Sequence, residues 1–86
     1  MYIHLSSTKS IRTERIIGVF DMDTATVGQP TRAFLARAQR DGRVIEALDA
    51  GDIPRSFVVT DAGEVILTQT SAAQIRYRVK NPVRRR

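Results

Sequence analysis

One segment, residues 55–68, limits the fold of this chain more than any other. It reads Arg-Ser-Phe-Val-Val-Thr-Asp-Ala-Gly-Glu-Val-Ile-Leu-Thr. The β-branched and aromatic residues at 56–60 and 64–68 predict two strands. Asp61-Ala62-Gly63 predicts the turn between them, in which Gly63 adopts the left-handed conformation that such a loop requires. Neither strand alternates cleanly between polar and apolar residues, so we expect both faces of this hairpin to be covered.

Two helices are the candidates for those covers, because a hairpin alone is not stable in water. The first helix is predicted over Pro30–Asp41, with proline at a first helical position and Gly42 as the C-terminal cap. Its core-facing stripe has the helical spacing i, i+3, i+4 and i+7, and consists of Thr31, Phe34, Leu35 and Ala38. A shorter helix is predicted over Ser71–Val79, since Ser71 and Gln74 have the spacing of a capping box.

Further strands are expected at residues 1–5, 11–21 and 43–48, and a loop at residues 21–29. Gly18, inside the second of these strands, indicates a β-bulge or a close backbone approach. We expect the three phenylalanines, Phe20, Phe34 and Phe57, to lie in the core. The order of elements predicts a small α+β domain with a mainly antiparallel sheet, one long helix and one short C-terminal helix. This single domain is expected to span residues 1–80, followed by a basic tail at 81–86.

Size and charge restrict the function. The 86 residues contain no cysteine, so neither disulfides nor a thiolate metal site is available. A domain this small buries a modest core, which association between copies would complete. No apolar run is long enough to cross a membrane and no signal-peptide pattern opens the chain, so we expect a cytoplasmic protein. The formal net charge is +5, and 12 of the 14 basic residues are arginine, which favours nucleic acid, an acidic protein or anionic lipid as the partner.

Enzymatic chemistry has little support in the sequence. Asp21-Met22-Asp23 after an apolar strand resembles the nucleophile motif of haloacid-dehalogenase-type phosphatases, but Ala25 stands at the place of their threonine and the chain is too short for that fold. Two carboxylates in this position more often lie in a solvated loop or in the segment that leads into a helix. His4 is the sole histidine, and the glycines are scattered singly. We therefore expect no catalytic site, no cofactor and no metal.

The arginines are the more informative set. Arg12 and Arg15 precede the apolar part of the second predicted strand, and Arg55 opens the hairpin. Four more accompany the long helix: Arg32, Arg37, Arg40 and Arg43. For any one of them the ordinary interpretation is a solvated helix face or the protection of a sheet edge. The tail residues Arg84–Arg86 are expected to be a solubilising end that adds unspecific attraction to phosphate.

Several segments, in order and spacing, resemble a known family. Residues 1–5 (Met-Tyr-Ile-His-Leu), 15–21 (Arg-Ile-Ile-Gly-Val-Phe-Asp), 41–44 (Asp-Gly-Arg-Val), 54–60 (Pro-Arg-Ser-Phe-Val-Val-Thr) and 65–67 (Val-Ile-Leu) are similar to the bacterial extracellular matrix regulatory proteins. This is the RemA/RemB family of small DNA-binding regulators of biofilm-matrix genes. The opening Tyr-Ile-His-Leu and the Pro-Arg-Ser segment are most similar to the RemB branch. The resemblance runs from Tyr2 to about Val79.

The resemblance implies a non-enzymatic transcriptional regulator that forms a homo-oligomeric ring and presents basic residues on its outside to duplex DNA. Arg15 matches the arginine whose change affects activity in the family, Pro30 the proline that begins the long helix, and Arg55 the arginine before the apolar hairpin strand. The sequence departs from the RemA type at Asp52 and Ile53, where that type has a basic pair, and in a longer loop at residues 21–29.

Two functional hypotheses follow. In the first, the protein is a DNA-binding ring, and Arg15, Arg32, Arg37 and Arg55 contact DNA phosphates or the neighbouring subunits. In the second, motivated by Asp52 and Ile53, the protein is an oligomeric scaffold for an acidic protein partner and does not bind DNA.

Overall fold

The predicted hairpin lies at the centre of a four-stranded sheet in the computed structural model, which describes residues 1–25 and 28–81. Its strands are β5 (Ser56–Thr60) and β6 (Val65–Thr68), joined by a turn in which Gly63 has a φ of 81°. Strand β3 (Ile16–Asp21) pairs antiparallel with β5, and β4 (Val44–Ala47) pairs parallel with β6. The strand order is β3-β5-β6-β4, so the sheet is mainly antiparallel, as predicted.

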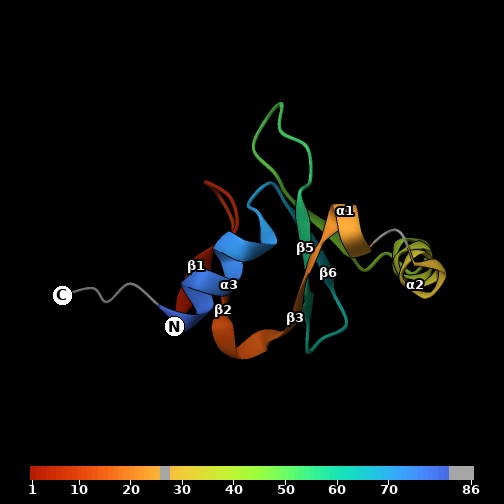
Figure 1. Ribbon diagram of the computed structural model, residues 1–86, viewed down its shortest axis with the longest axis horizontal. Helices are drawn as coiled ribbons and strands as arrows, with labels where there is room; N and C mark the ends of the chain where they lie inside the picture. The colour runs from red at the N-terminus through yellow and green to blue at the C-terminus, as the bar shows by residue number, and fades with distance from the viewer. Residues whose placement is uncertain (26–27, 82–86) are drawn as a thin grey trace.

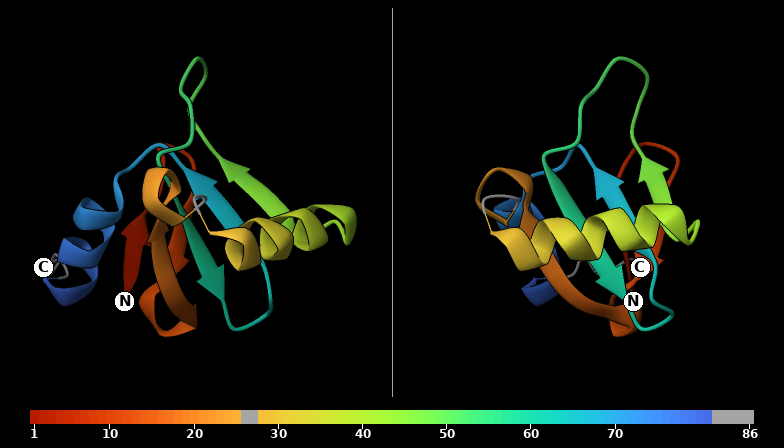
Figure 2. Two further views of the ribbon diagram at one scale, coloured as in Figure 1. Left: turned by 45° about the vertical axis from the view of Figure 1, so that its right-hand side comes forward. Right: turned by 90° about the vertical axis from the view of Figure 1, so that its right-hand side faces the viewer.

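Both faces of the hairpin are covered, which the lack of alternation predicted. Val58 and Ile66 point to one face, where they join a buried cluster with Ile3, Leu5, Ile11, Ala47 and Ile75. Phe57 and Val65 point to the other face, where they pack with Ala38. The first face carries α3 (Ala72–Lys80) and a separate hairpin of β1 (Tyr2–His4) and β2 (Ser10–Arg12), and the second carries α2 (Gln29–Arg40) (Figures 1 and 2).

The prediction of one strand over residues 11–21 is wrong, because the chain changes sheets within this segment. A single 3-10 turn, η1 (Thr13–Arg15), separates β2 from β3. The Thr13 amide donates to the Met1 carbonyl (2.8 Å), which closes the N-terminal hairpin. Two residues later, the Arg15 carbonyl accepts from the Asp61 amide (2.9 Å), which starts pairing with the central sheet. The turn therefore links β2, which pairs with the N-terminal strand, to β3, which pairs with the central hairpin.

The structure confirms the β-bulge predicted at Gly18. The register of β3 against β5 shifts between Ile16 and Gly18, which is a β-bulge. A Cβ atom at position 18 would lie 2.8 Å from Cε1 of Phe20, so the ring of Phe20 already occupies the space of a side chain there. Only glycine leaves room for this arrangement without a shift.

The segment predicted as a loop at residues 21–29 contains a short helix, α1 (Met22–Ala25). Oδ1 of Asp21 accepts from the amides of Asp23 (2.8 Å) and Thr24 (3.4 Å) and so satisfies the free donors at the start of this helix. The first carboxylate of the Asp-x-Asp motif thus has a capping function. Residues 26 and 27 of the predicted loop lie outside the described residues.

The two longer helices agree with the predictions to within about a residue. Helix α2 begins after Gly28 and is followed by Gly42, whose φ is 71°. At the start of α3, the Gln74 amide donates to Oγ of Ser71 (3.2 Å), which confirms the predicted N-cap. The predicted tail residues Arg84–Arg86 lie outside the part of the chain that the structure describes.

The prediction that all three phenylalanines are core residues holds for only one. Phe57 is 1% exposed, whereas Phe20 is 42% and Phe34 is 38% exposed. Helix α2 packs on the sheet through Leu35 and Ala38. Phe34 instead faces the space beside β3, so helical spacing alone placed it in the core incorrectly.

Candidate nucleic-acid interface

Three arginines serve the fold itself. Their guanidinium groups donate to backbone carbonyls: Arg43 to Gly63 (2.5 Å), Arg76 to Val19 (2.8 Å) and Arg78 to His4 (2.9 Å). Arg76 and Arg78 tie α3 to β3 and β1, and Arg43 ties the start of β4 to the central turn. The sequence grouped Arg43 with the arginines of the long helix, and gave no sign of these bonds because each partner is distant in the chain.

Arg15, a predicted contact residue, lies at the end of η1 and is held by the central turn. Its backbone carbonyl accepts from the Asp61 amide, and its Nε donates to Oδ1 of Asp61 (3.1 Å). Both side chains are about half exposed, so this ion pair contributes little to stability. It uses one of the five N–H donors of the guanidinium and leaves the terminal nitrogens for another partner.

Arg32 and Arg37, two further predicted residues, lie on the exposed side of α2 together with Arg40. Leu35 and Ala38 face the sheet, which turns these arginines outward. Arg32 donates to Oε1 of Gln29 (2.9 Å). Among the described residues neither Arg37 nor Arg40 has an ion pair or a side-chain hydrogen bond. The helix therefore presents basic groups that are available to a polyanion.

Arg55, the fourth predicted residue, directly precedes β5. Its amide donates to the Thr68 carbonyl (2.9 Å) and its carbonyl accepts from the Met22 amide (3.0 Å), so its backbone is fixed while its side chain is exposed. It ends the loop of residues 48–55, which projects from the body of the molecule (Figures 1 and 2). In this loop Asp52 and Ile53 are exposed, and Ile53 is 74% exposed.

The structure does not gather the four predicted arginines into one patch within a subunit. Arg32 and Arg37 lie on the helix that covers the Phe57–Val65 face, whereas Arg15 lies beside residues of the opposite face, Ile11 and Ile66. Arg15 and these two arginines of α2 therefore lie on opposite sides of the central sheet.

An apolar groove beside α2 is the feature that the sequence did not reveal. It has a volume of about 350 Å³ and lies between the first turns of α2 and strands β3 and β5. Its lining includes Ile17 (69% exposed), Gly18, Phe20 and Phe34. Phe20 stacks on Phe57 with ring centroids 5.1 Å apart. The bulge at Gly18 was the available signal, since it brings Ile17 and Phe20 to the same side of β3.

Residues 1–25 and 28–81 contain neither a candidate metal site nor a candidate membrane-spanning helix. Within them no group of three or more histidine, cysteine or acidic side chains is arranged to hold a metal ion. No helix of this described part is long and apolar enough to span a bilayer.

Comparison with known proteins agrees with the resemblance seen in the sequence. The family model described as RemA-like, extracellular matrix regulatory protein A-like, matches residues 2–79. No curated protein matches the chain. The match includes every strand of both sheets, the groove and nearly all of α3. The chain therefore belongs to the RemA-like family of extracellular matrix regulatory proteins.

Proposed function

We propose that this protein is a non-enzymatic, DNA-binding transcriptional regulator of matrix genes that works as a homo-oligomeric ring. One observation carries the proposal: an exposed apolar groove and a helix with outward-facing arginines occupy the same face of the subunit. The groove supplies a surface for self-association, and the helix supplies cations for DNA. Membership of the RemA-like family supports the regulatory role.

Self-association is the first step of the proposal. Exposed apolar patches framed by polar residues mark interaction sites on soluble proteins. The groove is bordered by β3, an edge strand of the four-stranded sheet. A ring requires that one surface of each subunit meets a different surface of the next, and the groove with its edge strand is one such surface.

DNA binding by repetition is the second step. The few phosphate contacts that one subunit offers through Arg32, Arg37 and Arg55 give weak, salt-sensitive binding. In a ring the first contact raises the effective concentration of all the others, so that affinity rises without any new type of contact. Arg15, on the other face, either reaches DNA from a differently oriented neighbour or contacts that neighbour.

The test is a titration of the full chain with duplex DNA at a series of salt concentrations. We expect a shift of the duplex whose affinity falls steeply between low and physiological salt. Arg37→Ala should lower the affinity and flatten the log–log salt dependence by about one unit of slope for each phosphate that the variant no longer binds. Lys80→Ala, which removes one charge from the exposed end of α3, is the matched control. Absence of binding at low salt, or binding that ignores salt, would refute DNA binding.

Arg15→Ala separates the two possible roles of Arg15 when light scattering accompanies the titration. If Arg15 contacts a neighbouring subunit, the particle mass falls. If it contacts DNA, the mass is unchanged and the affinity falls. Arg15→Lys retains the charge but loses the Nε bond to Asp61, so it distinguishes position from charge.

A scaffold for an acidic protein is the second candidate. The observation that favours it is the projecting loop, in which the exposed residues Asp52 and Ile53 stand where the RemA type has a basic pair, so that this part of the loop offers no cation to DNA. In this case the protein would form an oligomer that binds no duplex DNA at any salt concentration. Cross-linking would recover one defined acidic protein.

A further inference from the structure

Helix α2 lies at one end of the molecule with most of its surface free. Of its 12 residues only Ala38 is buried. It lies alone on its side of the central sheet, and the described part of the chain leaves its outer side uncovered (Figures 1 and 2). The major groove of DNA is about 12 Å wide, which admits a helix with its side chains. The position of α2 therefore allows it to enter such a groove.

The spacing of residues along α2 assigns its arginines to different sides. Successive residues are about 100° apart around a helix. Leu35 and Ala38 face the sheet, and Arg40 lies about 140° and 160° from them, so it points outward. Arg32 and Arg37 lie about 80° and 60° from Arg40 in opposite directions. One arginine is thus at the centre of the exposed surface, with one on each flank.

The outer face of α2 consists of four exposed residues, Gln29, Ala33, Ala36 and Arg40. The two alanines in its middle are short, so a partner can come close to the helix backbone. Oε1 of Gln29 accepts from Arg32 (2.9 Å), which holds that arginine on its flank. Arg40 has no ion pair or side-chain hydrogen bond among the described residues. Its forked guanidinium donors are therefore available to a ligand.

The charge of α2 is not neutralised within the helix. Residues 29–40 include three arginines and no acidic residue. Asp41 follows directly, but its Oδ2 accepts from the guanidinium of Arg43 (3.3 Å). The outer face and both flanks of α2 therefore complement a polyanion.

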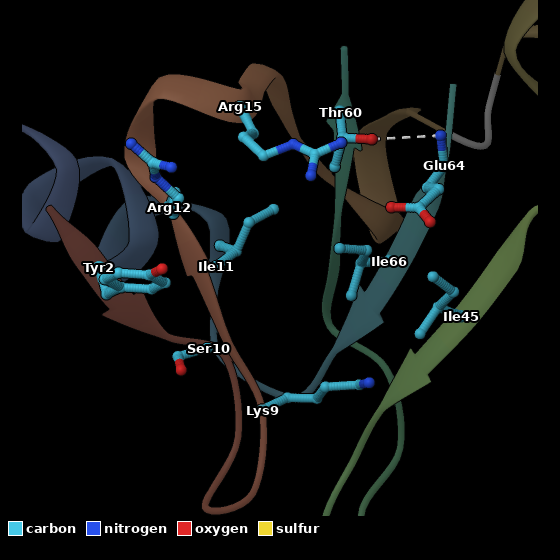
Figure 3. Close-up of a pocket in the computed structure, with 10 residues that line it drawn as sticks. All are labelled: Tyr2, Lys9, Ser10, Ile11, Arg12, Arg15, Ile45, Thr60, Glu64 and Ile66. Atoms are coloured by element: carbon cyan, nitrogen blue, oxygen red, sulfur yellow. Dashed lines mark hydrogen bonds between the residues drawn. The ribbon is translucent and has the colours of Figure 1, made fainter. Parts of the chain in front are cut away.

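The arginines on the other side of the sheet differ in this respect. Arg12 and Arg15 line a pocket between the N-terminal hairpin and the central sheet (Figure 3). Each has a carboxylate partner, Arg12 in Glu14 (3.7 Å) and Arg15 in Asp61 (3.1 Å). Arg12 consequently offers a matched control for the free arginines of α2.

The two kinds of position on α2 suit two kinds of DNA contact. Contacts to phosphates position a protein on the duplex, and contacts to base edges specify the sequence. For a helix in the major groove, flanking side chains reach the phosphates of the two strands, whereas the central side chain faces the bases. An arginine in that place donates two hydrogen bonds to O6 and N7 of guanine.

We propose that α2 enters the major groove of duplex DNA and that Arg40 recognises guanine there, while Arg32 and Arg37 bind phosphates on either side. The inference rests on the proposed DNA binding and adds sequence recognition to it. The apolar groove borders Phe34, which lies about 120° around the helix from Arg40. Self-association and base recognition therefore use different sides of α2.

Fluorescence anisotropy of the full chain with four short labelled duplexes at low salt tests the inference. One contains only G·C pairs and one only A·T pairs. In the third, 7-deazaguanine replaces guanine and removes the N7 acceptor of the major groove, and in the fourth, hypoxanthine replaces guanine and removes the amino donor of the minor groove. We expect the G·C duplex to bind about tenfold more tightly than the A·T duplex. The 7-deazaguanine duplex should lose most of this preference, and the hypoxanthine duplex should retain it.

Three variants separate base contacts from phosphate contacts. Arg40→Ala should abolish the preference for the G·C duplex and leave the salt dependence unchanged, because a base contact determines specificity. Arg37→Ala should weaken all duplexes equally and keep the preference, because a phosphate contact contains no sequence information. Arg12→Ala, which removes an equal charge from the other side of the sheet, should change neither the preference nor the salt dependence.

The outcomes distinguish this inference from the proposed function. Equal binding of all four duplexes, or equal losses on G·C and A·T duplexes in Arg40→Ala, would overturn base recognition and leave DNA binding intact. A loss with hypoxanthine but not with 7-deazaguanine would place the contact in the minor groove and overturn the inference as well. Absence of binding to any duplex would remove it together with the proposed function. Circular dichroism and particle mass, measured for each variant, show whether the fold and the oligomer are retained.

Discussion

The two faces of the central sheet differ in how completely they are closed. On the face of β1, β2 and α3, the side chains of Leu5, Val58 and Ile75 are fully buried. Polar bonds secure this cover: Arg76 and Arg78 hold α3, and the Thr68 hydroxyl donates to the Leu5 carbonyl. These bonds join segments that are distant in the sequence.

The face of α2 is left open at one side. Among the described residues, its buried cluster consists of Ala38, Phe57 and Val65, with partly buried side chains such as Leu35 packed against it. Ile17, Phe20 and Phe34 beside this cluster are exposed. One subunit thus completes its core on one face only. Apolar side chains on the closed face should therefore stabilise the single subunit, whereas the exposed apolar side chains on the open face should stabilise contacts between subunits.

The largest effect is expected on the closed face. Ile75→Ala should lower the free energy of unfolding by about 2–5 kcal/mol, since it leaves a cavity in a well-packed cluster. Phe34→Ala, a larger truncation on the open face, should lower it less at protein concentrations where the chain is monomeric. Urea denaturation of both variants measures the difference. Equal losses would mean that the open face is packed as well as the closed one.

A smaller effect is expected at the bulge. Gly18→Ala forces a Cβ atom against Phe20, and should cost about 1 kcal/mol, the low end for overpacking, because the half-exposed ring can move. The same movement changes the wall of the groove, so self-association should weaken as well. Gly28→Ala is the control for a steric clash, because its nearest contact would be at an ordinary 3.9 Å, and any loss of stability it causes reports the N-cap of α2 instead. A Gly18→Ala variant with unchanged stability and association would refute this account of the groove.

The smallest effect is expected from the protonation of Asp49, on the closed face, at acidic pH. Asp49 accepts from the Ser7 hydroxyl (2.5 Å) and amide (3.1 Å) and from Nε2 of Gln69 (2.6 Å), and these bonds, that of the Ser7 hydroxyl first, lower the pKa of its carboxyl. The stabilisation is therefore complete above the ordinary pKa of about 3.9 and is lost as the pH falls through the lowered value.

The corresponding prediction is that Asp49→Asn unfolds with a shallower dependence on pH than the natural chain below about pH 4. Asp52→Asn, which removes a carboxylate from the projecting loop, should leave the slope unchanged. Thermal unfolding between pH 3 and pH 7 gives both slopes. Parallel curves for all three proteins would contradict the role assigned to Asp49.

Local patterns predicted much of this fold. The central hairpin, the bulge at Gly18, the cap at Ser71 and the extent of the long helix depend on neighbouring residues, so the sequence specified them. The break at η1 was missed because it depends on pairing of Thr13 with Met1 on one side and of Arg15 with Asp61 on the other. Helix α1 was missed because its cap, Asp21, ends a strand.

The candidate site was less predictable than the fold. Helical spacing placed Arg32 and Arg37 on an exposed face, but assigning Arg15 to the opposite side of the sheet required the strand register. The structural roles of Arg43, Arg76 and Arg78 required partners 20, 57 and 74 positions away in the chain. The groove was hidden because Phe20 and Phe34 have the spacing of core residues.

The most direct test of the open face is the particle mass in dilute buffer, measured by light scattering for the natural chain, Ile17→Lys and Ile53→Lys. Both isoleucines are highly exposed, but only Ile17 lines the groove. The account predicts a closed multiple of the 9.6 kDa subunit for the natural chain and for Ile53→Lys, and a folded 9.6 kDa monomer for Ile17→Lys. A natural chain that is monomeric at every concentration, or two variants that dissociate equally, would contradict it.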